Sequence, residues 1–253
     1  MALSRLKMRV AEGRGLFTGL LLGSFFAFLI QPVRAQITVV SSNAASNQFS
    51  GSYTQDFNSL ISSGSIAWTN NSTVRGWYVS YQGSSNLTLK TTGAGSGDLA
   101  SYGTGTDRSL GACPGSATPI YLAFRLVNGT TNTLTGLNLQ YDLEKTGSGN
   151  MTATLAYQIF NAGAGSATSG TWITITTASS AGTALSSVLA NLSVPAGKEL
   201  WLRWQMSRTS GNATVMAIDN LSLSSLTWNS SSTAPSIQQQ PVSLTTEDGG
   251  AAT

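Results

Sequence analysis

The sequence predicts an all-β fold, and three observations carry that prediction. Short runs of alternating apolar and polar residues recur along the chain, as in strands with one buried and one wet face. Clusters of Gly, Asn, Ser and Thr separate these runs as turn signals, and no long helical pattern follows residue 35. About 190 residues between Gln36 and Trp228 suffice for one large core. The expected architecture is a two-sheet antiparallel sandwich, jelly-roll-like, preceded by a signal peptide.

Residues 1–35 are predicted to be that signal peptide. A basic start precedes the apolar run LFTGLLLGSFFAFLI, and the small residue Ala35 ends a signal-peptidase motif, VRA. An uncleaved membrane anchor is the alternative, but a membrane span needs about 20 apolar residues and this run is shorter. Cleavage before Gln36 predicts a secreted or cell-surface protein with no stable membrane insertion.

The charges of the mature chain differ from those of the whole sequence. The chain has 13 basic and 10 acidic residues, and residues 1–35 hold 5 and 1 of these, which leaves 8 basic, 9 acidic and a net charge of −1. No Lys/Arg cluster remains, so no nucleic-acid partner is predicted.

Histidine is absent and Cys113 is the single cysteine, which excludes a serine triad with a histidine base and a cysteine zinc site. Cys113 precedes a Pro-Gly turn and is predicted to be a small structural residue, an exposed redox thiol being the alternative.

Strands are expected wherever an alternating run lies between turn signals. KTGSGN, between two long runs, predicts a hairpin loop. A Gly-rich loop is expected over 98–107, and SSVLANLSV predicts a short turn followed by a strand at 191–194. The predicted strands cover 37–40, 53–57, 76–81, 86–90, 120–128, 134–145, 151–160, 171–177, 199–207 and 215–226.

Alternation also predicts which face each side chain takes. In ELWLRWQMS, Trp204 shares its face with Leu200, Leu202 and Met206, so it is expected in the core. Trp201 has the opposite parity and is the better surface candidate. An exposed aromatic ring can stack on the C–H face of a sugar, which makes Trp201, Trp77, Tyr78 and Tyr81 the candidate ligand-binding residues.

The acidic residues offer little for catalysis. Asp142 and Glu144 share one face of a strand, but that face is polar and a solvated surface explains both. No phosphate-cradling loop precedes a helix, and no motif supports a serine–lysine site. The sequence therefore predicts that this chain is not an enzyme.

Structural calcium is the one cofactor that the sequence suggests, because calcium accepts carboxylate and carbonyl oxygens. Asp56, near the start of the sandwich, and Asp219, near its end, are the candidate ligands if the first and last strands are neighbours. Asp98 and Asp107 form a second, weaker pair. The alternative is that each carboxylate caps a local turn.

The stretch MAIDNLSL contains a conflict of parity. Ile218 and Leu221 are both apolar but would point to opposite faces of a regular strand. A β-bulge near Asp219 and Asn220 would bury both and turn Asp219 off the core face. Otherwise the Asp219 carboxylate should be held by backbone N–H groups or by calcium.

Several motifs in order resemble a known family. YTQDFNSL, WTNNSTVRGWYVSY, GTGTDRSLG, AFRLVNGTTNTLTGLNLQYDLE and LWLRWQMSRTSGNATVMAIDNLSLS are similar to a β-rich module near the N-terminus of exported bacterial surface proteins. In that family the module precedes immunoglobulin-like repeats, sorting tails or nuclease domains. More distantly, AIDNLSL resembles the last strand of jelly-roll carbohydrate-binding modules, and that resemblance implies a calcium-ligating role for Asp219.

The composition changes after Trp228. Residues 229–236 are predicted to be a linker, and 36–228 the sandwich. Residues 237–253 resemble the opening strand of a bacterial immunoglobulin-like domain, cut short; a disordered tail is the alternative.

Together these features predict a non-catalytic extracellular or cell-surface module that binds a polysaccharide or cell-surface glycan, or serves as an adhesive or spacer domain. The alternative is an accessory domain of a secreted hydrolase, nuclease or glycosidase, whose catalytic domain lies outside this chain. The oligomeric state is left open.

Overall fold

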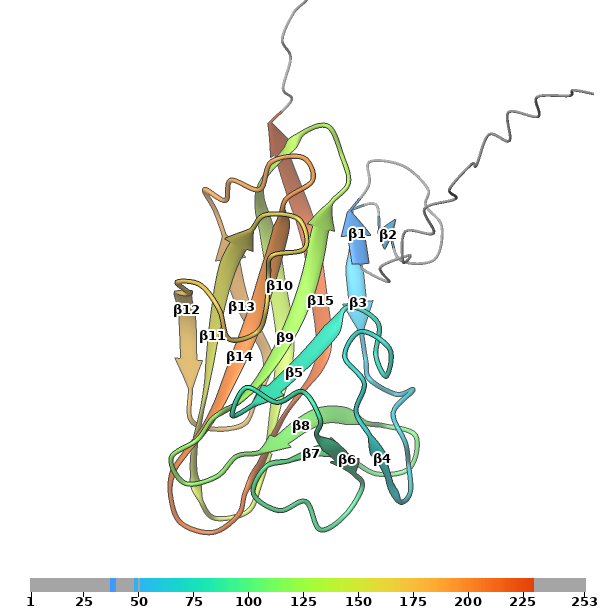
Figure 1. Ribbon diagram of the computed structural model, residues 1–253, viewed down its shortest axis with the longest axis vertical. Coiled ribbons are helices and arrows are strands. Elements are labelled where there is room, and N and C mark those ends of the chain that lie inside the picture. Colours follow the sequence, from blue (N-terminus) through green and yellow to red (C-terminus); the bar gives the residue numbers. More distant parts are fainter. Residues whose placement is uncertain (1–36, 40–47, 50, 230–253) are drawn as a thin grey trace, which may run out of the picture. The chain divides into compact units, whose positions relative to one another are not determined.

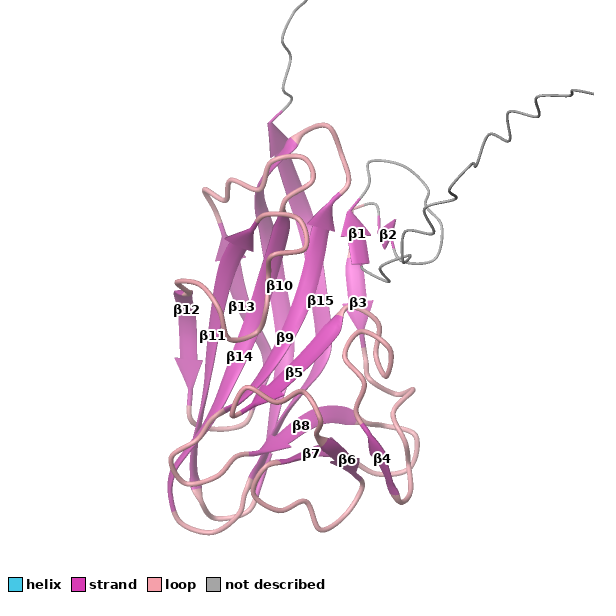
Figure 2. Cartoon of the chain, viewed as in Figure 1, coloured by secondary structure: helices cyan, strands magenta, loops and turns pink. Residues whose placement is uncertain are grey.

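The computed structural model describes residues 37–39, 48–49 and 51–229, and within this part every regular element is a strand (Figure 2). The predicted signal peptide, the linker beyond Asn229 and the segment 237–253 lie outside the described residues. Within the described part no helix is long and apolar enough to cross a membrane. The all-β prediction is therefore confirmed.

The first sheet, here sheet A, has seven strands in the order β12-β11-β14-β9-β1-β2, with β5 also paired to β9 (Figure 1). One edge of β9 pairs with β14, and the other is shared by β5 and β1. The pairs β1–β2 and β1–β9 are parallel, and the remaining pairs are antiparallel. The bounds are β1 (Ile37–Val39), β2 (Gln48–Phe49), β5 (Trp77–Tyr81), β9 (Ile120–Asn128), β11 (Asn150–Phe160), β12 (Ile173–Ala178) and β14 (Glu199–Ser210).

The second sheet, sheet B, has eight strands in the order β13-β10-β15-β8-β7-β6-β4, with β3 also paired to β15. Only the pair β6–β7 is parallel in this sheet. The bounds are β3 (Tyr53–Gln55), β4 (Ser65–Ala67), β6 (Thr88–Lys90), β7 (Asp98–Tyr102), β8 (Ser109–Cys113), β10 (Thr133–Thr146), β13 (Gly182–Leu189) and β15 (Val215–Asn229).

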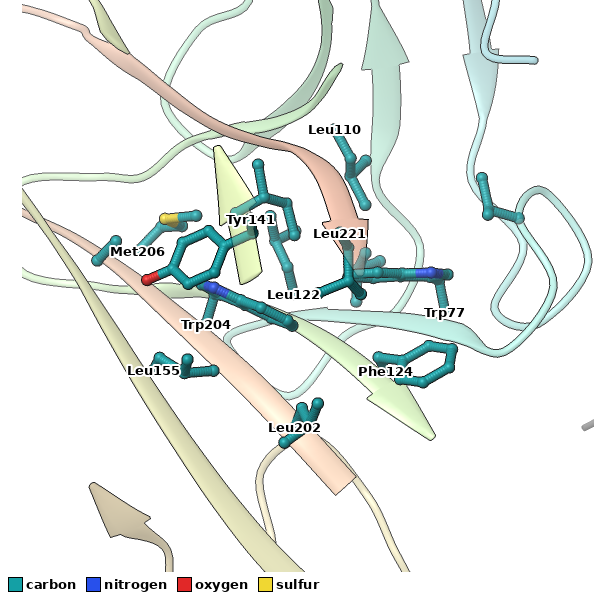
Figure 3. Packing of buried hydrophobic residues seen from close by; sticks show 14 of the residues in the cluster. Trp77, Leu110, Leu122, Phe124, Tyr141, Leu155, Leu202, Trp204, Met206 and Leu221 are labelled. Atoms are coloured by element: carbon teal, nitrogen blue, oxygen red, sulfur yellow. The ribbon is translucent and has the colours of Figure 1, made fainter. Parts of the chain in front are cut away.

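The core lies between the two sheets and is rich in aromatic rings (Figure 3). Trp204 of β14 stacks on Trp77 of β5, with ring centroids 5.6 Å apart, and meets the ring of Tyr141 from β10 edge-on at 5.5 Å. Phe124 of β9 lies 5.5 Å from the ring of Trp77. Because these rings come from both sheets, their burial fixes one sheet on the other.

Most predicted strands are present, and the long ones end within a few residues of the predicted bounds. The missed strands are β4, β7, β8 and β13, together with the two-residue β2. Strand β7 occupies part of the segment expected to be a Gly-rich loop, and the β13 strand at 182–189 replaces the strand expected at 191–194. All five residues of β8 are buried, so its sequence shows no alternation to detect.

The predicted bulge in β15 is confirmed. The register with β10 pairs Gln140 with Ser222 but Asp142 with Asp219, so Asn220 and Leu221 together face one residue, Tyr141. Asn220 takes a left-handed conformation, with φ at 48°. Ile218 and Leu221 both enter the core, and Asp219 leaves it. The strand pairs with β8 before the bulge and with β3 after it.

Candidate functional site

A pocket opens on the outward face of sheet A. Its empty space is about 450 Å³, including the mouth. Tyr78 and Ser80 of β5 and Trp201 of β14 reach it from the sheet. The segment 82–86 after β5 and the loop 161–172 between β11 and β12 supply the other walls. The lining residues are Asn70, Tyr78, Val79, Ser80, Gly83, Ser85, Gly165, Ser166, Ala167, Thr168 and Trp201, and none of them is acidic, basic, His or Cys.

Strand alternation explains which of the predicted aromatic residues meet here. Tyr78 lies on the outward face of β5, half-buried, and its ring centroid is 4.7 Å from that of Trp201. Trp77 and Tyr81 have the opposite parity: Trp77 is fully buried, and Tyr81 packs against the core. The prediction was wrong for Trp77, whose ring is fully buried and cannot stack on a ligand. Tyr81 is half-buried but lies outside the lining of this pocket, and its role in binding stays a prediction. Of the four candidates, Tyr78 and Trp201 share the pocket.

The exposure predicted for Trp201 is also wrong, because the loop 161–172 covers the indole. Trp201 has the predicted outward parity but is 2% exposed. A Cβ on Gly165 would lie 2.3 Å from the indole nitrogen, so glycine lets the loop backbone rest directly on the ring. Ala167 of the loop and Ala123 of β9 complete a small cluster of buried residues around Trp201. Trp201 thus forms a wall of the pocket, and Tyr78 is the more accessible ring.

A buried ion pair holds this arrangement from below. Arg125 of β9 donates from Nη2 to Oε1 of Glu199 on β14 and from Nη1 to the Tyr78 hydroxyl, at 3.3 Å in the latter case. Oε1 of Glu199 also accepts the backbone N–H of Gly163, and Oε2 accepts the indole N–H of Trp201 at 2.9 Å. Burial alone would raise the pKa of Glu199, but these donors outweigh it and hold the pKa below the usual range. Glu199 therefore orients the loop and the indole and stays ionised.

Arg203 is a second arginine on this face, and sequence analysis did not single it out. Its guanidinium carbon lies 4.0 Å from the ring centroid of Trp172 and 4.6 Å from that of Tyr121. Nη1 donates to the carbonyl of Ala167 at 3.0 Å, which ties Arg203 to the wall of the pocket. The alternating pattern did place Arg203 beside Trp201 on the outward face, and that signal could have identified it.

The loop residues of the pocket were also missed. Asn70 accepts the backbone N–H of Val79 at 2.7 Å and the Trp68 indole N–H at 2.8 Å, and so fixes the turn before β5. Ser166 and Ser169 bond to each other at 2.9 Å within the covering loop. No local motif marks such residues, because the course of a Gly- and Ser-rich loop is decided by what it packs on.

Three acidic side chains lie together on the outward face of sheet B. Asp142 and Asp219 are directly opposite each other on β10 and β15, and Glu144 follows on the same face. Asp142 accepts the backbone N–H of Ala184 at 2.6 Å and the side-chain amide of Asn220 at 2.9 Å. The Asp219 carboxyl is 3% exposed, and its Oδ1 has no hydrogen-bond partner within the described residues.

Burial raises the pKa of Asp219 to about 6. The backbone N–H of Asn220 opposes this rise, and the negative charges of Glu144, Asp107 and Asp142 add to it. Asp219 thus lies off the core face, as the bulge predicted, but its negative charge has too few hydrogen-bond donors around it there.

Of the other predicted calcium ligands, Asp56 and Asp98 have local partners, and Asp107 lies apart from Asp98. Strand β3 does pair with β15, so the first and last strands near Asp56 and Asp219 are neighbours, but the exposed Asp56 accepts the N–H of Asn58 at 3.1 Å in a local turn. Asp98 forms an ion pair with Lys90 at 2.6 Å and lies opposite Cys113, whereas Asp107 lies beyond the other end of β7, so the two are separated by at least about 13 Å of strand.

Within the described part of the chain no three acidic or cysteine side chains are arranged to hold a metal ion. Calcium at Asp56 and Asp219 stays a prediction. Cys113, at the end of β8, is fully buried and burial raises the pKa of its thiol, which excludes an exposed redox thiol.

No family model matches this chain, and no curated protein matches it. Three solved structures are similar to it at low identity. TmCBM61, in complex with β-1,4-galactotriose, is 11% identical over 58% of this chain and 86% of that chain, with a TM-score of 0.32. The enzymatically active domain of tailspike protein 4 from bacteriophage CBA120 is 12% identical over 60% and 19%, with a TM-score of 0.36. The K3 cleaved adhesin domain of Lys-gingipain from Porphyromonas gingivalis w83 is 10% identical over 59% and 92%, with a TM-score of 0.36.

Proposed function

We propose that this chain is a non-catalytic, secreted or cell-surface β-sandwich module that binds a glycan in the pocket on sheet A. The observation that carries the proposal is the pairing of a half-buried ring, Tyr78, with hydroxyl-bearing walls at Ser80, Ser85, Ser166 and Thr168. A sugar needs this combination, because its C–H face packs on an aromatic ring while its hydroxyls exchange hydrogen bonds with polar groups.

The chemistry of the pocket favours binding over catalysis. Glycoside hydrolysis uses two carboxyl groups that face the scissile bond. No carboxyl group is among the lining residues. Glu199 lies behind Trp201, fully buried, with both oxygens already bound. An adhesive role, or a role that keeps an attached domain on its substrate, would require binding but no catalysis.

The test is binding of the purified protein to a panel of soluble polysaccharides by affinity electrophoresis and calorimetry. We expect at least one to bind, and Tyr78→Ala to weaken it by about tenfold or more. Tyr102→Ala is the matched control, because Tyr102 is a half-buried tyrosine on β7 of sheet B. Circular dichroism and melting confirm that both variants fold.

Failure of every polysaccharide to bind would contradict the proposal, as would equal losses in the two tyrosine variants. Release of reducing sugar from any bound polysaccharide would contradict the non-catalytic part.

A further inference from the structure

The two arginines on the outward face of sheet A differ in their partners. The charge of Arg125 is compensated by Glu199, and this contact raises the pKa of Arg125 despite its burial. No described carboxylate lies within ion-pair distance of Arg203. Burial lowers the pKa of Arg203, and the nearby hydroxyl of Tyr121 opposes this only in part. Arg203 therefore holds a partly desolvated positive charge that nothing in the described part of the chain offsets.

The described residues that contact Arg203 or lie directly across from it on the neighbouring strands carry no negative charge. Its cross-strand neighbours are Ala156 on β11 and Ala123 on β9. Tyr121 and Trp172 lie against its guanidinium, and the backbone of Ala167 accepts one of its protons. The sequence has no charged residue from Thr146 to Gly197, which includes β11, β12 and the whole covering loop. An anion approaching Arg203 from that flank meets no repulsion.

The stacked geometry leaves the edge of the guanidinium available for a ligand. Rings at 4.0 and 4.6 Å are positioned to contact the flat guanidinium group, whose N–H bonds point outward in its plane. A guanidinium has five N–H donors, and of those on Arg203 one is used by Ala167 while Nε is buried without a partner. The donors on the terminal nitrogens that remain match the two oxygens of a carboxylate.

Arg203 is also in line with the pocket. The strand register places Tyr78, Ala123 and Arg203 in one row across β5, β9 and β14. Two steps between neighbouring strands span about 10 Å, roughly the length of a disaccharide. A sugar chain that leaves the pocket over the small residue Ala167 would bring a neighbouring sugar to Arg203.

We propose that Arg203 is the residue of this site that recognises charge, and that the ligand is a polysaccharide bearing the carboxylate groups of uronic acids. This inference rests on the proposed glycan-binding function and adds the class of glycan to it. A neutral sugar would leave the charge of Arg203 uncompensated, whereas a uronate would pair with it in two parallel hydrogen bonds.

The experiment compares acidic polysaccharides with neutral forms of the same polymers. Polygalacturonate, alginate and glucuronoxylan are each titrated beside their carboxyl-reduced counterparts. We expect at least one uronate polymer to bind about tenfold more tightly than its reduced form, an advantage that shrinks with added salt. This comparison uses the unaltered protein and does not depend on any variant folding.

Variants then assign the preference to Arg203. Arg203→Gln should abolish the preference, so that the uronate polymer and its reduced form bind this variant equally. Arg203→Lys should keep part of the advantage, because the charge remains but the planar fork is lost. Lys145→Gln, which removes the same charge from β10 of sheet B, should change nothing.

The outcomes separate the two proposals. If neutral and acidic forms bind equally, or if the preference survives Arg203→Gln, the inference is overturned and the glycan-binding function stands. If dextran sulfate binds as tightly as a uronate polymer, recognition of carboxylate is overturned. If no polysaccharide binds, both proposals fall.

Discussion

Glu199 on sheet A and Asp219 on sheet B are both buried carboxylates that point away from the core, and they meet different surroundings. Glu199 is fully buried, yet an arginine, a backbone N–H and an indole N–H satisfy its two oxygens. Asp219 is 3% exposed, has an oxygen without a partner and faces other acids. Their pKa values shift in opposite directions as a result: below the usual range for Glu199, and to about 6 for Asp219.

The difference comes from what covers each sheet. The loop 161–172 lies on sheet A and brings the N–H of Gly163 to Glu199, so its course and the ion pair stabilise each other. On sheet B the neighbours of Asp219 are Asp142 directly opposite and Glu144 on the same strand as Asp142. Burial alone therefore does not decide whether a carboxyl group is ionised at a given pH. The donors delivered by neighbouring segments decide it.

The largest expected effect is the loss of the ion pair on sheet A. Glu199→Gln leaves the buried charge of Arg125 without its partner, and the free energy of unfolding should fall by about 3–5 kcal/mol. Urea unfolding measures this. Asp98→Asn is the control, because the Lys90–Asp98 pair is partly exposed and its loss should cost about 1 kcal/mol or less. Equal losses of stability in the two variants would show that burial makes the Arg125–Glu199 pair no more important than the partly exposed Lys90–Asp98 pair.

The second prediction concerns Asp219 and depends on pH. Its folded-state pKa of about 6 lies above the ordinary value of 3.8, so the folded state binds the proton more tightly than the unfolded state. Stability should fall as pH rises from about 4 to 6 and then level off, at a cost of about 2–3 kcal/mol. Asp219→Asn removes this cost and should raise the free energy of unfolding by that amount at pH 7.5, with little gain at pH 4.

Melting curves across this pH range measure the gain, and Asp56→Asn is the control. Asp56 is exposed and caps a local turn, so its variant should show no gain that grows with pH. A constant difference between wild type and Asp219→Asn at every pH would show that Asp219 does not titrate as the structure indicates.

Much of the sandwich could be predicted from the sequence because its long strands alternate cleanly. The β10, β11 and β14 runs each combine a buried row with a more exposed row over much of their length, and such a pattern is visible locally. Strand β8 is buried throughout, and β13 is a small-residue strand at the edge of sheet B, so neither carries that signal. The bulge in β15 was predictable because its conflict of parity lies within four residues.

Only those features of the site that follow from the alternation of side chains along a strand could be predicted from the sequence. Parity alone separates Tyr78 from Trp77 on β5, and it assigns Trp201 and Arg203 to one outward face. It gives no sign that a loop 29 to 40 residues earlier in the sequence would cover Trp201. That contact is tertiary: Gly165 fits on the indole, and Gly163 reaches Glu199. The covering of a surface ring therefore required the structure.

A smaller effect should follow from disturbing the cover of sheet A. Gly165→Ala places a methyl group within 2.3 Å of the Trp201 indole nitrogen, which a rigid ring cannot accommodate without a shift of the loop. We expect a loss of about 1–3 kcal/mol in the free energy of unfolding. Gly95→Ala is the control, since its new methyl group would lie 3.6 Å from the nearest atom, an ordinary contact. An unchanged unfolding curve for Gly165→Ala would show that the loop does not press on the indole.

The smallest effect is expected from calcium on sheet B. Since no three acidic side chains converge in the described residues, a calcium ion at Asp219 would need backbone carbonyl oxygens for most of its ligands. Bound calcium would offset the buried charge of Asp219. At a calcium concentration ten times the dissociation constant of the site, binding would add about 1.4 kcal/mol to the free energy of unfolding. We therefore expect calcium to raise the melting midpoint of the wild type by roughly 3–6 °C and to leave Asp219→Asn unchanged. Magnesium is the control ion, because its octahedral demand suits such a site poorly. If the midpoint of the wild type is the same in calcium and in chelator, Asp219 holds no calcium, and its buried charge is relieved by protonation alone.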